Sequence, residues 1–317
     1  MKIRKFLSML LLIAIFATLI AGCSPKSEKE SVNILALKGP TGIGLAWLMD
    51  GNGNENYNIT LVSSPDEITG KFANGVDIAA MPINLASVLY NKMEGDAIII
   101  AVNTLGVLYV LENGNTVNSI TDLTGKTLYA TGQASTPEYI LNHILEKNNI
   151  DCTVEYKTEH SELATLIGSG DIVLGMLPEP NVTSVLNTNK DVRIALNLTS
   201  EWNKIEDTEL VQACIVINKK YLTEHTDVVD IFLKDYAESV NQVNNNTSEI
   251  APLIEKYGIM ASAALAEKAV KNCNIVCITG DSMKLATANM LTVLFNANPK
   301  SIGGKLPSDD FYYIGQK

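Results

Sequence analysis

The stretch at residues 32–49, VNILALKGPTGIGLAWLM, decides the fold. Its first six residues form an apolar run, which predicts a strand. Four glycine and proline residues then fall within residues 39–44, which predicts a tight turn. The apolar residues 45–49 predict the start of a helix. A strand, a tight turn and a helix together make the opening unit of a parallel α/β sheet.

The turn at residues 39–44 has two interpretations. The first turn of a helix carries unpaired N–H groups and a partial positive charge, and glycines let a ligand approach that backbone. The turn is therefore either part of a binding site or only a sharp connection. Its sequence, GPTGIG, matches neither the dinucleotide-binding fingerprint nor the P-loop spacing.

The first residues of the chain predict an export signal. Three basic residues precede an apolar segment at residues 6–21, and small residues stand before Cys23. The pattern resembles a bacterial lipobox, which implies cleavage before Cys23, lipidation of its thiol by a group that carries fatty acids such as palmitate, and anchoring to the outer face of the cell membrane. A plain signal peptide or an uncleaved anchor is the alternative. We expect a signal peptide at residues 1–22 and a lipidated, flexible tether at residues 23–31.

The composition is that of a globular protein, and the chain carries an excess of negative charge. The chain has 317 residues, of which 46% are hydrophobic, and a formal net charge of −11. It contains two arginines, Arg4 and Arg193, and Arg4 belongs to the export signal. Arginine forks are a common contact to phosphates and nucleic acid. The sequence therefore argues against a nucleic-acid partner and against an arginine clamp on an anionic ligand.

Motifs for metal binding and catalysis are missing from the sequence. The four cysteines after Cys23 match no zinc spacing, and neither G-x-S-x-G nor H-E-x-x-H occurs. We expect His143, His160 and His225 to be solvated or capping residues. Cys273 and Cys277 are expected to be buried free thiols, with a disulfide as the alternative. We therefore predict no cofactor, no metal and no enzymatic activity.

An internal repeat divides the chain. The segment at residues 74–82, NGVDIAAMP, resembles SGDIVLGMLP at residues 169–178. Their Asp-Ile pairs are 94 residues apart, and the turn glycines Gly39 and Gly132 are 93 residues apart. A coincidence of two landmarks is the alternative. The repeat predicts two α/β lobes with the same order of strands and helices.

Two facing lobes predict a cleft. Ligands of open parallel sheets bind beyond the carboxyl ends of the strands. Four loops would then converge on the cleft, at residues 39–42, 82–84, 132–136 and 178–180. The crossovers near residues 104–106 and 199–212 would act as hinges that close the lobes over a ligand.

Longer motifs point to one family. They are ALKGPTGIG, MPINLASVLYN, NTLGVLYVLE, DLTGKTLYATGQASTPEYIL and MLPEPNVTSVL. With the lipobox they resemble the solute-binding lipoproteins of bacterial ABC importers, nearest to the nitrate/sulfonate/taurine and thiamine-pyrimidine-precursor type. The resemblance covers essentially the whole mature chain. It implies a type II, two-lobed periplasmic-binding-protein fold, in which each lobe is a mixed, mostly parallel sheet flanked by helices and two crossover strands form the hinge.

The same resemblance implies the function. Lobe one would comprise residues 32–104 plus 212–317, and lobe two residues 105–211. A monomeric receptor would capture a small molecule and deliver it to ABC permease subunits in the membrane. One alternative is an enzyme of menaquinone or thiamine-precursor metabolism, because fold does not give function. Another is a ligand sensor for a membrane signalling protein. The export signal argues against the enzyme.

The predicted ligand-binding residues come from strand ends and crossovers, and most have a structural alternative as caps, turns or hinges. They are Gly39, Pro40, Thr41, Gly42, Asn84, Asn103, Thr104, Gln133, Ser135, Thr136, Glu179 and Trp202.

Two of these residues bear on the chemistry of the ligand. Helix N-termini and hydroxyls suit a sulfonate or a carboxylate. The scarcity of arginine, a carboxylate at Glu179 and a ring at Trp202 favour a neutral or cationic ring instead. Glu179 could equally face water, and Trp202 could pack between the lobes. We expect a small organic solute, pyrimidine-like.

Overall fold

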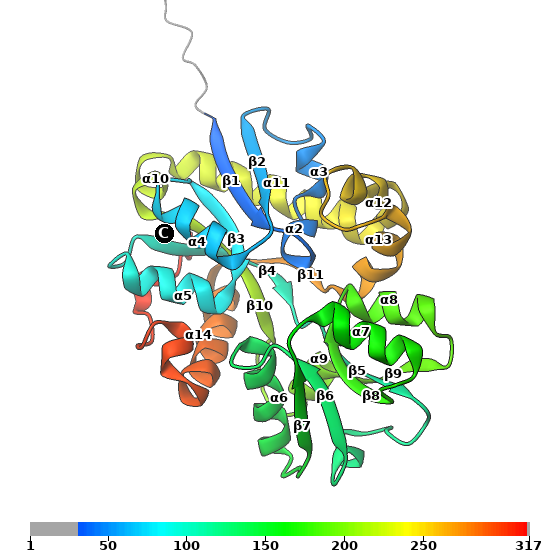
Figure 1. Ribbon diagram of the computed structural model, residues 1–317. Helices are drawn as coiled ribbons and strands as arrows, with labels where there is room; N and C mark the ends of the chain where they lie inside the picture. The colour runs from blue at the N-terminus through cyan, green and yellow to red at the C-terminus, as the bar shows by residue number, and fades with distance from the viewer. Residues whose placement is uncertain (1–30, 316–317) are drawn as a thin grey trace, which may run out of the picture.

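The computed structural model describes residues 31–315. The predicted signal peptide, the lipidation at Cys23 and nearly all of the predicted tether therefore lie outside the described residues. Within residues 31–315 the chain forms two lobes, each a mixed sheet covered by helices, joined by strands that run between them (Figure 1). The predicted two-lobed α/β architecture is confirmed.

The sheet of lobe one has six strands. In spatial order they are β11 (Ile275–Ile278), β4 (Ala97–Leu105), β10 (Val211–Asn218), β3 (Ile78–Pro82), β1 (Val32–Leu37) and β2 (Tyr57–Val62). Strand β1 pairs in parallel with β2 and β3, whereas β10 is antiparallel to both β3 and β4. The opening stretch thus places its strand between two parallel neighbours.

The sheet of lobe two has five strands. In spatial order they are β7 (Thr153–Lys157), β6 (Thr127–Thr131), β8 (Leu174–Pro178), β5 (Leu108–Asn113) and β9 (Val192–Asn197). Strand β6 pairs in parallel with β7 and β8, and β5 is antiparallel to β8 and β9.

The helices cover the sheets of both lobes (Figure 1). Lobe one carries α2 (Pro40–Ile43), α3 (Ala46–Met49), α4 (Pro65–Ala73), α5 (Ile83–Lys92), α10 (Lys219–Glu224), α11 (Thr226–Asn245), α12 (Thr247–Lys256), α13 (Ala263–Ala269) and α14 (Gly280–Ala297). Lobe two carries α6 (Thr136–Lys147), α7 (His160–Ser169), α8 (Asn181–Thr188) and α9 (Leu198–Trp202). Short 3-10 turns are η1 (Ile120–Leu123), η2 (Val270–Asn272), η3 (Pro299–Ile302) and η4 (Asp309–Phe311).

The predicted start of α4 shows how local sequence sets an element. The Ser64 side chain accepts a hydrogen bond from the N–H of Glu67, at 3.2 Å. Pro65 occupies the first helical position, where no N–H is needed, and Asp66 and Glu67 complement the helix dipole. Lys71 in the last turn does the same at the other end.

The predicted repeat appears in the topology. The order β2-β1-β3 in lobe one corresponds to β7-β6-β8 in lobe two. In each lobe the third strand then pairs with an antiparallel strand that follows a crossover, β10 in lobe one and β5 in lobe two. The two lobes are therefore built alike, and each is completed by a strand that has just crossed from the other.

One core joins the two lobes. A cluster of buried apolar side chains runs through the crossovers, where it includes Val102, Leu108, Leu210 and Val211. Trp202, with none of its surface exposed, belongs to the same cluster. The lobes are consequently connected by packing as well as by the chain.

The region after Tyr221 is mostly helical and contains one strand. Strand β11 interrupts the helices and pairs antiparallel with β4. Its sequence, IVCI, is apolar and β-prone, and the free edge of β4 supplies a pairing partner that a local reading does not contain. The cysteines of the described residues are free, as predicted for Cys273 and Cys277, although Cys277 is only partly buried.

No helix within residues 31–315 has the length and the apolar character that crossing a membrane would require.

We predict that Gly106→Ala destabilises the crossover between β4 and β5. A Cβ at this position would collide with Oγ1 of Thr199 and would lie 2.7 Å from Cδ2 of Leu210. Overpacking of this kind costs about 1–3 kcal/mol of the free energy of unfolding, which urea titration measures. The control is Gly70→Ala within α4, where nothing lies within 4 Å of the added Cβ. The control should be neutral or stabilising, and equal stabilities for the two variants would refute the prediction.

Candidate functional site

A cavity of about 610 Å³ lies between the lobes. Its volume is within the range of roughly 300–1,000 Å³ that is typical of small-molecule sites. Lobe one contributes Lys38, Gly39, Pro40, Thr41, Pro65, Pro82, Asn84 and Leu85. Lobe two contributes Gly132, Ser135, Thr136, Pro137, His160, Pro178, Glu179, Pro180 and Asn181. The crossovers contribute Thr104, Val107, Gln212 and Ala213.

The cavity lies where parallel strands end. Its lobe-one residues follow β1, β2 and β3, and its lobe-two residues follow β6, β7 and β8. The four loops that we expected to converge all contribute to it. Because helices begin directly after these strands, the cavity gathers the N-termini of α4, α5, α6, α7 and α8. Such ends present unpaired N–H groups and partial positive charge.

Proline and glycine shape the rim of the cavity. Six of the ten prolines of the chain line it. Their fixed φ suits the first positions of helices, where Pro65 and Pro137 stand. Gly39 and Gly132, the paired turn glycines, both have φ of 82°, a left-handed conformation that favours glycine. The prolines thus stiffen the rim, and the two lobes contribute equivalent turn glycines to it.

Eight of the twelve predicted ligand-binding residues line this cavity. They are Gly39, Pro40, Thr41, Asn84, Thr104, Ser135, Thr136 and Glu179. Their contact with a ligand stays a prediction.

Three of the remaining predicted residues lie beside the cavity without lining it. A Cβ at Gly42 would lie 2.7 Å from the carbonyl oxygen of Leu37, so this glycine lets α2 pack against the end of β1. Asn103 is 1% exposed and donates its amide to the carbonyl of Thr41 at 2.9 Å. It therefore holds the first loop instead of meeting the cavity. Gln133 is exposed at the turn after β6.

Trp202 lies in the core, away from the cavity. Its Nε1–H donates to the carbonyl of Thr208 at 2.8 Å, and its ring lies 5.3 Å from that of His143. The ring has no exposed surface. The predicted stacking of Trp202 on a ligand does not fit this position, whereas packing, the alternative, does.

Glu179 lines the cavity, and its carboxylate accepts three hydrogen bonds from protein groups. One oxygen accepts hydrogen bonds from the Thr183 hydroxyl and the Asn272 amide, both at 2.9 Å. The other accepts from the N–H of Thr183 at 3.0 Å. Glu179 is 2% exposed, and burial raises its pKa above the usual value although these hydrogen bonds oppose the shift. The alternative that Glu179 faces water is therefore wrong.

Asn272 connects the two lobes at this point. It lies in η2, next to the lobe-one sheet, and donates to Glu179 of lobe two. Its carbonyl accepts a hydrogen bond from the hydroxyl of Tyr109, on β5, at 2.8 Å. The pair Glu179–Asn272 is therefore a polar contact between the lobes at the wall of the cavity.

His160 lines the cavity, which sequence reasoning did not predict. Its Nδ1 lies 2.6 Å from the hydroxyl of Thr131, and partial desolvation lowers its pKa. Lys38 and Glu179 are the other ionisable residues of the cavity wall. Arg193 pairs with Glu112 at 2.6 Å, away from the cavity.

Several polar side chains of the cavity have no hydrogen bond within residues 31–315. They are the side chains of Thr41, Asn84, Thr136, Asn181 and Gln212. Hydroxyl and amide groups in this state can bind a polar small molecule. Asn181 and Gln212 were not predicted. Asn181 is the first residue of α8, after β8, and Asn84 is the second residue of α5, after β3, so both lie at the start of the helix that follows the third parallel strand of a lobe.

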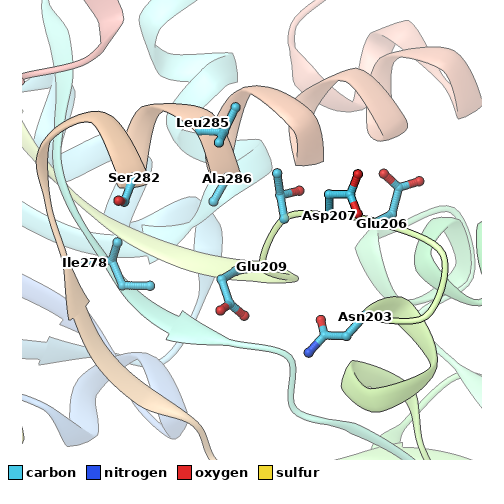
Figure 2. Close-up of a pocket in the computed structure, with 9 residues that line it drawn as sticks. Asn203, Glu206, Asp207, Glu209, Ile278, Ser282, Leu285 and Ala286 are labelled. Atoms are coloured by element: carbon cyan, nitrogen blue, oxygen red, sulfur yellow. The ribbon is translucent and has the colours of Figure 1, made fainter.

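A second cavity of about 470 Å³ opens between the loop before β10 and α14 (Figure 2). The carboxylates of Glu206, Asp207 and Glu209 come from the loop, and Leu285 comes from α14. None of the predicted binding residues lines it. It does not lie at the carboxyl ends of the parallel strands, so the interlobe cavity is the candidate site. Within residues 31–315 no cluster of His, Cys, Asp and Glu could hold a metal ion.

Comparison with known proteins identifies the family. The NMT1/THI5-like family model matches residues 50–250. This is more than half of the chain, and the chain therefore belongs to the NMT1/THI5-like family. No curated protein matches the sequence.

Solved structures share the fold. An ABC transporter structure from Parabacteroides distasonis is 23% identical, with 91% of this chain and 100% of that one covered and a TM-score of 0.78. The periplasmic aliphatic sulphonate binding protein SsuA of Escherichia coli is 14% identical, with 92% and 96% covered and a TM-score of 0.70. The alkanesulfonate-binding protein SsuA of Xanthomonas axonopodis pv. citri, bound to MOPS, is 13% identical, with 89% and 96% covered and a TM-score of 0.61. The fold is thus periplasmic-binding-protein-like, as the resemblance implied.

We predict that Glu179 makes stability depend on pH. The pKa of Glu179 is raised above 4.5 in the folded chain. Just above pH 4.5 the folded chain therefore still binds a proton at Glu179, whereas the unfolded chain has lost it. Stability contributed by this group is therefore present below pH 4.5 and falls as pH rises toward the folded pKa.

Glu179→Gln removes this titration. The variant should gain stability relative to the parent chain as pH rises from 4.5, in urea titrations at matched pH values. A stability difference between the two chains that is constant across this range would contradict the prediction.

Proposed function

We propose that this chain is the substrate-binding component of an ABC importer, which captures a small organic solute between its lobes and delivers it to a membrane permease. It acts as a monomer in this role and performs no chemistry on its solute. The observation that carries the proposal is the interlobe cavity of about 610 Å³, with unpartnered hydroxyl and amide groups from both lobes. Its fold neighbours include proteins named for binding aliphatic sulphonates and alkanesulfonates, which supports the same role.

The chemistry of the cavity favours a solute with an anionic or hydrogen-bond-accepting group. The argument for a cationic ring relied on Glu179 and Trp202. The carboxylate of Glu179 is already engaged, and Trp202 does not line the cavity. What remains are helix N-termini, the Lys38 ammonium and neutral polar side chains. These groups suit the oxygens of a sulfonate or a carboxylate on a small organic body.

The first test is a thermal-shift screen. The panel is MOPS and simple alkanesulfonates, nitrate, thiamine-pyrimidine precursors and flavins. One compound should stabilise the chain, by roughly 2.7 kcal/mol at 100 times its dissociation constant. If none of them changes the melting temperature, this set of ligands is rejected.

A second test asks whether both lobes contact the solute. Thr41→Val removes a lobe-one hydroxyl, and Asn181→Ala removes a lobe-two amide. Each loss of a hydrogen bond should cost about 1 kcal/mol of binding free energy, which calorimetry with the stabilising compound measures. The control is Asn115→Ala, an exposed residue outside the cavity. Unchanged affinity in both cavity variants would remove the two-lobe site.

We also propose that Cys23 is lipidated and tethers the chain to the extracytoplasmic face of the cell membrane. The support is the order of basic, apolar and small residues before Cys23. In a bacterial host supplied with a labelled palmitate analogue, the parent chain should carry the label and sediment with membranes. Cys23→Ser should do neither, and a variant that still carries the label and sediments with membranes would contradict a tether at Cys23.

A further inference from the structure

Gln212 lies at an irregularity in strand β10. In the antiparallel pairing of β10 with β4, Val211 faces Leu105. Ala213, two residues further along β10, faces Thr104, the direct neighbour of Leu105. Gln212 is therefore the extra residue of a β-bulge. A bulge breaks the alternation of a strand and re-aims a side chain, and this one does so where the strand meets the interlobe cavity.

The side-chain amide of Gln212 has no partner among the described residues. Its Nε2 is buried and makes no hydrogen bond, while the residue lines the cavity. Five buried side-chain atoms within residues 31–315 are in this state, and the others belong to residues that do not line this cavity. A buried amide nitrogen without a partner lowers stability. Such a group is expected where a bound molecule supplies the acceptor.

The protein groups around the cavity do not supply that acceptor. Val107 and Ala213 line it with apolar side chains. The carboxylate of Glu179 already accepts three hydrogen bonds. Asn103, the nearby buried amide of β4, is by contrast satisfied by the carbonyl of Thr41. The side-chain amide of Gln212 therefore lacks an acceptor, whereas the side-chain amide of Asn103 on the neighbouring crossover strand has one.

We propose that Gln212 is a specificity-determining residue, whose amide donates to an oxygen or nitrogen acceptor of the bound solute. The inference rests on the function proposed above. Because Gln212 belongs to a crossover strand, the acceptor that it binds lies between the lobes. Thr41 and Asn84 from lobe one and Asn181 from lobe two then surround the same molecule. The predicted solute is a small organic molecule whose carbonyl, carboxylate or sulfonyl oxygen faces Gln212.

Two substitutions separate donation from shape. Gln212→Met keeps the length of the side chain and removes the amide. Gln212→Glu keeps the shape and an oxygen but cannot donate when ionised. The control, Gln242→Met, removes an amide from the surface of α11, outside the cavity. The probe is the screened compound that stabilises the parent chain most, beginning with MOPS.

Without any compound, Gln212→Met should melt at the same temperature as the parent chain or higher. With the probe, the dissociation constants of both Gln212 variants should rise at least tenfold, while that of the control should not change. A large fall in melting temperature without compound, or an unchanged dissociation constant, would overturn the inference.

The outcomes also distinguish this inference from the proposed function. If no compound stabilises the parent chain, the proposed ligand set fails. The melting temperature of Gln212→Met then decides the role of the residue by itself. An equal or higher value supports an amide held for an external partner, and a lower value shows that the amide serves the fold.

Discussion

The antiparallel pairing of β4 with β10 determines where the two lobes face each other. Strand β4 leads out of lobe one toward β5, and β10 brings the chain back from lobe two. Because β5 and β10 pair with β8 and β3, respectively, each crossover is tied to the last parallel strand of a lobe. The carboxyl ends of both sets of parallel strands therefore meet at one cavity.

The residues that stiffen the cavity differ from the polar residues that have no hydrogen-bond partner. The prolines and the turn glycines stiffen the rim, and Asn103 holds the first loop through the carbonyl of Thr41. The side chains of Thr41, Asn84, Thr136, Asn181 and Gln212 in the wall have no hydrogen-bond partner among residues 31–315. Glu179 differs from these side chains, because its carboxylate accepts hydrogen bonds from Thr183 of α8 and from Asn272 of the other lobe. It serves the contact between the lobes, and its predicted contact with the solute stays a prediction.

The sequence predicted what depends on local pattern and on the repeat. Strand and helix order, the two lobes and the converging loops follow from periodicity, turn residues and the 93–94-residue offset. The burial of Trp202, the inward contact of Asn103 and the edge strand β11 depend on tertiary partners that no local pattern contains. The exposure of Gln212 to the cavity depends on a bulge, which only the pairing register of two distant strands reveals.

The most direct measurement is a crystal structure of the chain with the compound that stabilises it most. A solute bound between the lobes, touching side chains from both of them and from β10, is the predicted result. A compound bound to one lobe alone, or in the cavity beside α14 that Figure 2 shows, would contradict the interlobe site.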